Sequence, residues 1–106
     1  MRNLGLLCEI RAAAYLKKQG MKILCRRYRA ADGEIDIIAL DGSTTVFVEV
    51  KESGALSAGL ERVNRDKRRR IRNAAARYMA QNGCLVCRFD VVEESKAGFL
   101  HIRNAF

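Results

Sequence analysis

The chain has 106 residues, 49% of them hydrophobic, and 20 lysines and arginines against 12 aspartates and glutamates, for a formal net charge of +8. This length and apolar content predict one domain over residues 1–106 and exclude wholesale disorder, while the charge favours a polyanionic partner, nucleic acid before an acidic membrane surface. The apolar runs are too short for a membrane span of roughly 18–20 residues, so we expect a cytoplasmic protein that does not associate with membranes.

The first predicted element is a helix over residues 3–19. Apolar residues recur there at helical spacing, and Gly20 suits the left-handed position just past the end of the helix. Glu9 lies beside the apolar stripe of this helix, where a carboxylate commonly pairs with a nearby arginine. Residues 21–28 alternate apolar and polar side chains, which predicts a strand.

Residues 33–51 predict two strands joined at Asp41-Gly42, because Asp-Gly between β-rich runs is a strong hairpin signal. Side chains alternate between the two faces of a strand. A two-residue loop makes Asp36 and Glu49 diagonal neighbours on one face, and a four-residue loop from 41 to 44 sets them directly opposite. In both cases they lie roughly 5–8 Å apart. A three-residue loop would put them on opposite faces.

Two carboxylates this close raise each other's pKa unless a cation lies between them. Carboxylates are hard oxygen ligands suited to Mg²⁺ or Mn²⁺. Lys51 shares the face of Glu49, where its ammonium group can orient or deprotonate a water, or stabilise charge on a scissile phosphate. The pattern therefore predicts a metal site formed by Asp36 and Glu49. The alternative is a solvated face with an ordinary Glu–Lys pair.

Residues 58–82 predict a long helix with eight basic side chains against two acidic ones. This excess favours contact with phosphates over an ordinary solvated helix face. Lys67 interrupts the apolar stripe of the helix, so it either points toward the functional edge of the sheet or extends to solvent. The side chains expected to bind nucleic acid are Arg62, Arg65, Lys67, Arg68, Arg69 and Arg72.

Residues 85–92 and 99–103 predict two further strands. The helix that precedes them allows a right-handed crossover, which makes the strands at 44–51 and 85–92 parallel. The element order α-β-β-β-α-β-β therefore predicts an α/β fold, with a mixed central sheet flanked by helices.

The cysteines carry less information, because a cytoplasmic protein is expected to keep them reduced. Cys84 and Cys87 are spaced as C-x₂-C, but a zinc site needs about four ligands. Cys8, Cys25 and His101 are the other candidate soft ligands, and they form no second pair. We expect neither zinc nor a redox dithiol, and we interpret His101 as an ordinary strand residue.

The chain resembles the YraN family of small bacterial proteins over nearly its whole length. The resemblance rests on residues 33–39 (Gly-Glu-Ile-Asp-Ile-Ile-Ala), 46–51 (Val-Phe-Val-Glu-Val-Lys) and 88–92 (Arg-Phe-Asp-Val-Val), with the basic helix and the opening helix. YraN proteins are similar to the PD-(D/E)xK nuclease superfamily, close to archaeal Holliday-junction resolvases, which implies a restriction-endonuclease-like fold. The chain departs from the family at Cys8, where Gly is common, and at Arg27, where Asn is common.

The resemblance implies that Asp36, Glu49 and Glu9 bind the metal and that Lys51 is the catalytic lysine, with Glu9 completing the acidic cluster of catalytic residues. It also implies that Lys67 is a helix cation near the site. We therefore expect an Mg²⁺- or Mn²⁺-dependent endonuclease that hydrolyses DNA rather than RNA, with branched DNA among its candidate substrates. Symmetric cutting of a junction would need a homodimer.

Two other functions fit the same sequence features. One is a non-catalytic nucleic-acid-binding domain on the same fold. The other is a scaffold whose basic helix docks an acidic protein or membrane. Metal binding without cleavage would favour the first. The absence of any metal dependence, with binding to polyacidic peptide or anionic lipid as strong as to DNA, would favour the second.

Overall fold

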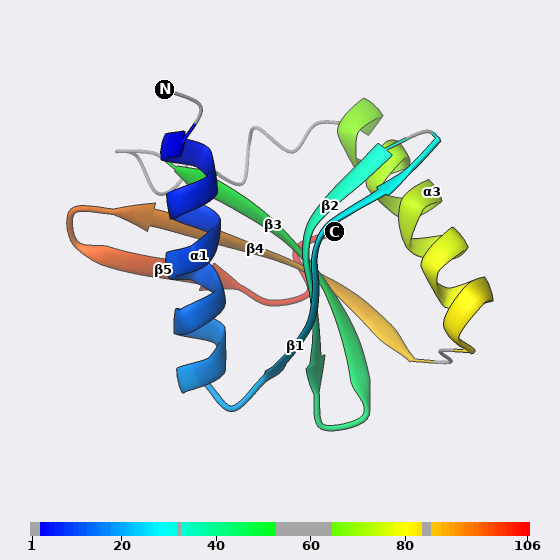
Figure 1. Cartoon of the computed structure of the whole chain (residues 1–106), viewed down its shortest axis with the longest axis horizontal. Helices are drawn as coiled ribbons and strands as arrows, with labels where there is room; N and C mark the ends of the chain where they lie inside the picture. Colours follow the sequence, from blue (N-terminus) through cyan, green and yellow to red (C-terminus); the bar gives the residue numbers. More distant parts are fainter. Residues whose placement is uncertain (1–2, 32, 53–64, 84–85) are drawn as a thin grey trace.

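Figure 1 shows the computed structural model, which describes residues 3–31, 33–52, 65–83 and 86–106, with side chains from residue 5 onward. Its elements are α1 (Asn3–Lys18), β1 (Lys22–Ala30), β2 (Gly33–Asp41), β3 (Thr44–Glu52), α3 (Arg65–Asn82), β4 (Cys87–Ser95) and β5 (Gly98–Ile102). The order α-β-β-β-α-β-β and the α/β class are confirmed. The first residues of the predicted helix, 58–64, lie outside the described residues.

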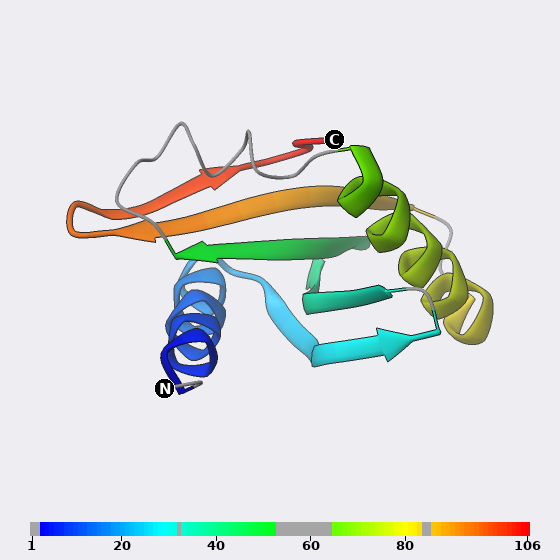
Figure 2. The same cartoon turned by 90° about the horizontal axis from the view of Figure 1, so that it is seen from above.

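The five strands form one mixed sheet in the order β1-β2-β3-β4-β5. β3 and β4 are parallel, as predicted, and the other neighbouring pairs are antiparallel. Figure 2 shows α1 and α3 at well-separated parts of this sheet. Within the described residues, no helix is long and apolar enough to cross a membrane.

Alternation along the strands builds two hydrophobic clusters. Val46 and Val48 pack with α1 residues, while Phe47, between them, packs with Ile71 and Ala74 of α3. Because successive strand residues point to opposite faces, α1 and α3 cover opposite faces of the sheet.

α1 ends as the sequence predicts. Gly20 has φ of +94°, and its amide donates to the carbonyl of Lys17, while the Met21 amide donates to the carbonyl of Leu16. This pair of hydrogen bonds is the Schellman arrangement, which satisfies carbonyls at the helix end. Leu16 and Met21 are both buried, so the turn is fixed by packing as well as by hydrogen bonds.

The hairpin turn lies one residue later than predicted. Asp41 pairs with Thr44, so Gly42 and Ser43 form a two-residue loop, with φ of +64° at Gly42. Asp41 is held in the strand because its carboxylate accepts hydrogen bonds from arginines of β4 and the C-terminal segment. The strand register is nevertheless the one that we predicted for the longer loop, which sets Asp36 against Glu49.

β1 and β4 both continue beyond their predicted ends at residues 28 and 92. Arg29 pairs with Glu34 in the sheet, and the β4 residues Glu93 and Glu94 pair with Leu100 and Phe99. Charged residues interrupt the alternation of apolar and polar side chains by which a strand is predicted from sequence. In the structure, pairing with a neighbouring strand still satisfies their backbone hydrogen-bonding groups. The added length of β4 places two glutamates beside the end of β3.

Candidate functional site

Asp36 on β2 and Glu49 on β3 face each other across the central hairpin. The β2–β3 ladder ends at the pair Ile37–Val48, one residue short of both acids. The two acids line the same cavity, where the charge of Glu49 acts on Asp36. The Asp36 carboxylate accepts a hydrogen bond from the Val50 amide, with an Oδ2–N distance of 2.8 Å. Glu49 is buried, with 5% of its surface exposed. The structure therefore brings together the two carboxylates that the sequence predicts to share a face.

Two lysines converge on Glu49. Its Oε2 atom lies 3.2 Å from Nζ of Lys51 and 2.5 Å from Nζ of Lys67. Lys51 comes from β3, two residues after Glu49, whereas Lys67 reaches the sheet from the first turn of α3. Of the two predicted orientations of Lys67, the structure shows the one directed toward the sheet.

The electrostatics of these groups differ. Burial, followed by the charge of Glu49, raises the pKa of Asp36 to about 8, against an opposing hydrogen bond from the Val50 amide. Burial and the neighbouring Lys67 lower the pKa of Lys51. Burial is the largest single influence on Lys67 and disfavours its charged form, but its contacts with Glu49 and Lys51 and the charges of the two acids together raise its pKa. The raised pKa of Asp36 thus comes first from burial and second from the neighbouring carboxylate.

Glu9 reaches the same region from α1, where it is buried. Its Oε1 atom accepts a hydrogen bond from Nε of Arg27 at 2.9 Å. Arg27 has φ of +57°, a left-handed conformation that Asn adopts more readily than Arg. The departure from Asn at this position therefore comes with an ion pair that engages the third predicted metal ligand.

All five charged groups line one cavity of about 260 Å³, which holds Glu9, Asp36, Glu49, Lys51 and Lys67 in its wall. A second cavity of about 230 Å³ shares Asp36, Glu49 and Lys67 with the first and adds, among others, Gly33 and Arg70. A third, of about 330 Å³, continues past Gly33 and Arg70 to Arg29. These three hollows, here called the groove, extend from α1 to the start of β2.

The donor set fits a hard divalent cation. Mg²⁺ typically takes one or two carboxylates and completes its shell with water and substrate phosphate. Asp36 and Glu49 supply that number. Within the described residues, no three His, Cys, Asp or Glu side chains gather closely enough to hold an ion. Glu9 thus lines the cavity without joining the other two acids in this conformation.

The basic residues of α3 point in several directions. Lys67 faces the groove, whereas the guanidinium groups of Arg68 and Arg72 lie over the ring of Phe106, at 5.5 and 5.7 Å. Arg69 pairs with Asp66 on the same helix. Arg65 is exposed. Arg62 lies outside the described residues.

Arg29 and Arg70 are groove residues that the sequence analysis did not select. Arg70 was counted in the basic run, but helical spacing alone could not show that it borders the same hollow as Asp36. Arg29 falls just beyond the predicted end of its strand. The sequence feature that could have indicated these two residues is their positive charge, but many exposed arginines share it.

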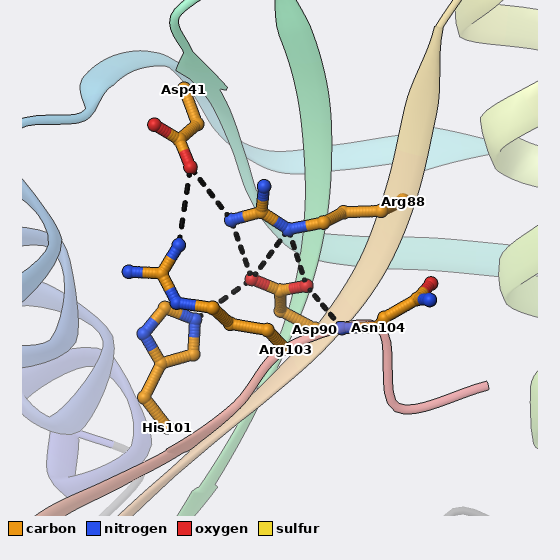
Figure 3. Close-up of polar contacts among 6 residues, drawn as sticks. All are labelled: Asp41, Arg88, Asp90, His101, Arg103 and Asn104. Carbon is orange, nitrogen blue, oxygen red and sulfur yellow. Dashed lines mark hydrogen bonds and ion pairs between the residues drawn. The ribbon is translucent and has the colours of Figure 1, made fainter.

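A second polar cluster lies away from the groove, around Asp90 of β4 (Figure 3). The buried Asp90 carboxylate accepts hydrogen bonds from Arg88, from His101 at 2.8 Å and from the Asn104 amide at 2.9 Å. Burial alone would raise the pKa of Asp90, but these donors outweigh it and lower the pKa. His101 lies in β5 as predicted and ties that strand to β4. Cys84 of the C-x₂-C pair lies outside the described residues.

The model of the uncharacterised protein family UPF0102 matches residues 8–93. A UPF0102 protein of Lachnoclostridium phytofermentans is 44% identical over 96% of this chain and 91% of its own length. One from Alkaliphilus oremlandii is 41% identical over 99% of this chain and 98% of its own length. One from Thermotoga neapolitana is 46% identical over 88% of each chain.

Proposed function

The chain belongs to the UPF0102 family, the family also called YraN, and on that premise we propose that it is a cytoplasmic, metal-dependent nuclease of the PD-(D/E)xK type that hydrolyses DNA phosphodiesters. The observation that carries this proposal is the placement of Asp36 beside Glu49, with two lysines on Glu49, in the wall of a groove. Such a group of charges suits chemistry on a phosphate better than it suits a structural ion pair.

Each residue has a distinct proposed role. Asp36 and Glu49 would hold Mg²⁺ or Mn²⁺, and Glu9 would join them if Arg27 released it. A bound divalent cation would supply an activated water and stabilise charge on the phosphate. Lys51 orients that water or steadies the charge that develops on the scissile phosphate. Lys67, which is 36% exposed, can turn from Glu49 to a phosphate oxygen of the substrate.

The groove favours an extended polyanion as substrate. Arg29, Arg70 and Lys67 border its two hollows on the side away from α1, where backbone phosphates would contact them without readout of sequence. The net charge of +8 would strengthen such contacts at low salt. Charge acts on any phosphate backbone, so the preference for DNA, including branched DNA cut by a homodimer, rests on the family resemblance.

A second candidate function is a nucleic-acid-binding domain without turnover. One specific observation favours it: Glu49 is held by two lysines, and Glu9 is held by Arg27. If those ion pairs persist when DNA binds, no site remains for a metal. This candidate keeps the groove and the basic helix but assigns the charged residues to binding alone.

Cleavage of labelled four-way junction, flap and linear duplex DNA with Mg²⁺ or Mn²⁺ tests the proposal. We expect metal-dependent cutting that Glu49→Gln and Lys51→Ala abolish, while the matched control Lys17→Ala, on the exposed end of α1, leaves it unchanged. Binding without cutting, equal in all four proteins, would favour the non-catalytic domain. Binding to polyacidic peptide as tight as to DNA would instead indicate a scaffold.

A further inference from the structure

Glu93 on β4 is a buried carboxylate that the proposed chemistry does not use. Its surface is 0% exposed, and within the described part of the chain neither of its carboxylate oxygens has a hydrogen-bond partner. Buried polar groups are nearly always hydrogen-bonded, so an exception requires a physical explanation. Glu94, the next residue, accepts a hydrogen bond from Arg11, which gives it a structural role.

The register places Glu93 beside the candidate site. Glu93 and Lys51 are partners in the parallel ladder between β4 and β3. Paired residues on neighbouring strands project from the same face of a sheet, and neighbouring strands lie about 4.8 Å apart. Glu49 is two residues before Lys51 and shares that face. Lys51 therefore has Glu49 beside it on its own strand and Glu93 beside it on the next, and its ammonium group contacts Glu49.

Metal binding at Glu49 would create a conflict at one oxygen atom. Oε2 of Glu49 already contacts the ammonium groups of both Lys51 and Lys67. A divalent cation on the same carboxylate would repel both groups at short range. Lys67 is 36% exposed and can move toward solvent or phosphate, whereas Lys51 is only 14% exposed. Lys51 therefore needs another acceptor close to its present position.

We infer that Glu93 is this acceptor: a positioning residue that takes the Lys51 ammonium group when Glu49 binds a divalent metal. The inference rests on the proposed function, because it presupposes a metal on Glu49. The exchange makes no covalent bond. It gives the buried Glu93 carboxylate a partner, frees Glu49 for the metal and keeps the cation of Lys51 beside the site.

A double-mutant cycle on metal affinity tests the exchange without measuring cleavage. Calorimetric titrations with Mn²⁺ would compare the wild type, Glu93→Gln, Lys51→Met and the double variant. We expect Glu93→Gln to weaken Mn²⁺ binding about tenfold, a coupling typical of groups in direct contact. In the Lys51→Met background, Glu93→Gln should have no effect, since no ammonium group needs a new partner.

The other outcomes of the cycle overturn the inference. Unchanged or tighter Mn²⁺ binding by Glu93→Gln would show that Glu93 does not receive Lys51. Equal weakening in both backgrounds would identify Glu93 as a metal ligand instead. Glu93→Asp is the matched conservative variant, and it should recover part of the wild-type affinity. Absence of any Mn²⁺ binding would overturn both this inference and the proposed nuclease.

A measurement on the unmodified protein guards against variants that do not fold. The carboxyl ¹³C resonance of Glu93 should shift when Mg²⁺ is added, and this shift should be absent in Lys51→Met. If Mg²⁺ shifts the carboxyl resonance of Glu49 but not that of Glu93, the inference is overturned. Coupling between Glu93 and Lys51 without DNA cleavage would refute only the nuclease, and cleavage without that coupling would refute only the exchange.

Discussion

At the scale of single residues, Arg27 combines a backbone conformation that suits asparagine with a side chain that engages Glu9. Arg27→Asn should leave the free energy of unfolding nearly unchanged, because relief of left-handed strain offsets the loss of a partly exposed ion pair. The same change should raise Mg²⁺ affinity several-fold, because it releases Glu9 toward the other two acids. Thermal unfolding and calorimetric titration would measure the two effects.

Arg26→Asn is the matched control for this prediction, because Arg26 is an exposed neighbour outside the left-handed region. It should change neither quantity appreciably. Metal affinity that is unchanged or lower in Arg27→Asn would show that Glu9 does not contribute to the site.

Asp36 makes the stability of the metal-free protein depend on pH. Its pKa is raised from 3.8 to about 8, so the folded state holds this proton more tightly than the unfolded chain does. The free energy of unfolding should therefore fall as the pH rises through that window, by a few kcal/mol at most. Asp36→Asn cannot ionise, so in EDTA it should match the wild type near pH 4 and exceed it above pH 8.

Urea denaturation at several pH values measures this difference. Glu34→Gln removes an exposed carboxylate of the same strand and should show no comparable trend. A stability difference between Asp36→Asn and wild type that stays constant from pH 4 to pH 8.5 would contradict the raised pKa.

Asp90 makes stability depend on pH in the opposite direction. Its pKa is lowered, so its contribution to stability is present above its ordinary pKa of 3.8 and is lost as the pH falls through the folded value. Asp90→Asn should cost about 3–5 kcal/mol near neutral pH, because it leaves Arg88 and His101 without their buried partner. Asp41→Asn, a more exposed acid of the same cluster, should cost less than about 1 kcal/mol in the same urea titrations. Equal costs would refute the central position of Asp90.

At the scale of elements, Gly33 is a point of close approach between β2 and α3. A Cβ atom added there would lie 2.5 Å from the backbone oxygen of Arg70. Gly33→Ala should therefore push α3 away from the sheet, cost about 1–3 kcal/mol and weaken the contact between Lys67 and Glu49. Gly5→Ala, which meets nothing within 4 Å, is the matched control. A Gly33→Ala protein as stable as wild type would contradict this prediction, because it would show that α3 can move away from the sheet at no cost in stability.

The sequence predicts elements well where one face is apolar and poorly where charge masks the pattern. α1 and the β2–β3 hairpin follow from apolar periodicity and turn residues. The ends of β1 and β4 were missed because Arg29 and Glu93 look like loop residues, and only the partner strand reveals their pairing. The turn was misplaced by one residue because Asp41 is held by arginines remote in the sequence.

At the scale of the whole molecule, the groove predicts which arginines bind the substrate. Arg70→Ala and Arg29→Ala should each weaken DNA binding several-fold and reduce the salt dependence of binding by about one phosphate contact. Arg77→Ala removes the same charge from an exposed part of α3 outside the groove, so it should have a smaller effect. Fluorescence anisotropy at several salt concentrations measures both quantities. Equal effects of all three variants would indicate non-specific attraction.

The candidate site was predictable only in part, for a reason of topology. Asp36, Glu49 and Lys51 lie on two strands adjacent in sequence, so strand alternation and one turn suffice to bring them together. Other charged residues join the site through packing of distant elements, which periodicity does not encode. Arg29 and Arg70 are such residues. For Lys67 the sequence left two orientations open, and the family resemblance implied the one near the site.

The two-residue turn also bears on the order in which the residues of the site come together during folding. A hairpin closes in about 1–10 μs, so we expect Asp36 and Glu49 to meet before tertiary packing brings Lys67 from α3. During that interval the nascent hairpin carries two close carboxylates without the helix lysine, and their repulsion opposes closure. The pair of carboxylates that suits the folded protein to bind a cation should therefore slow the closure of this hairpin early in folding. The same cation, present during synthesis, would reduce the repulsion.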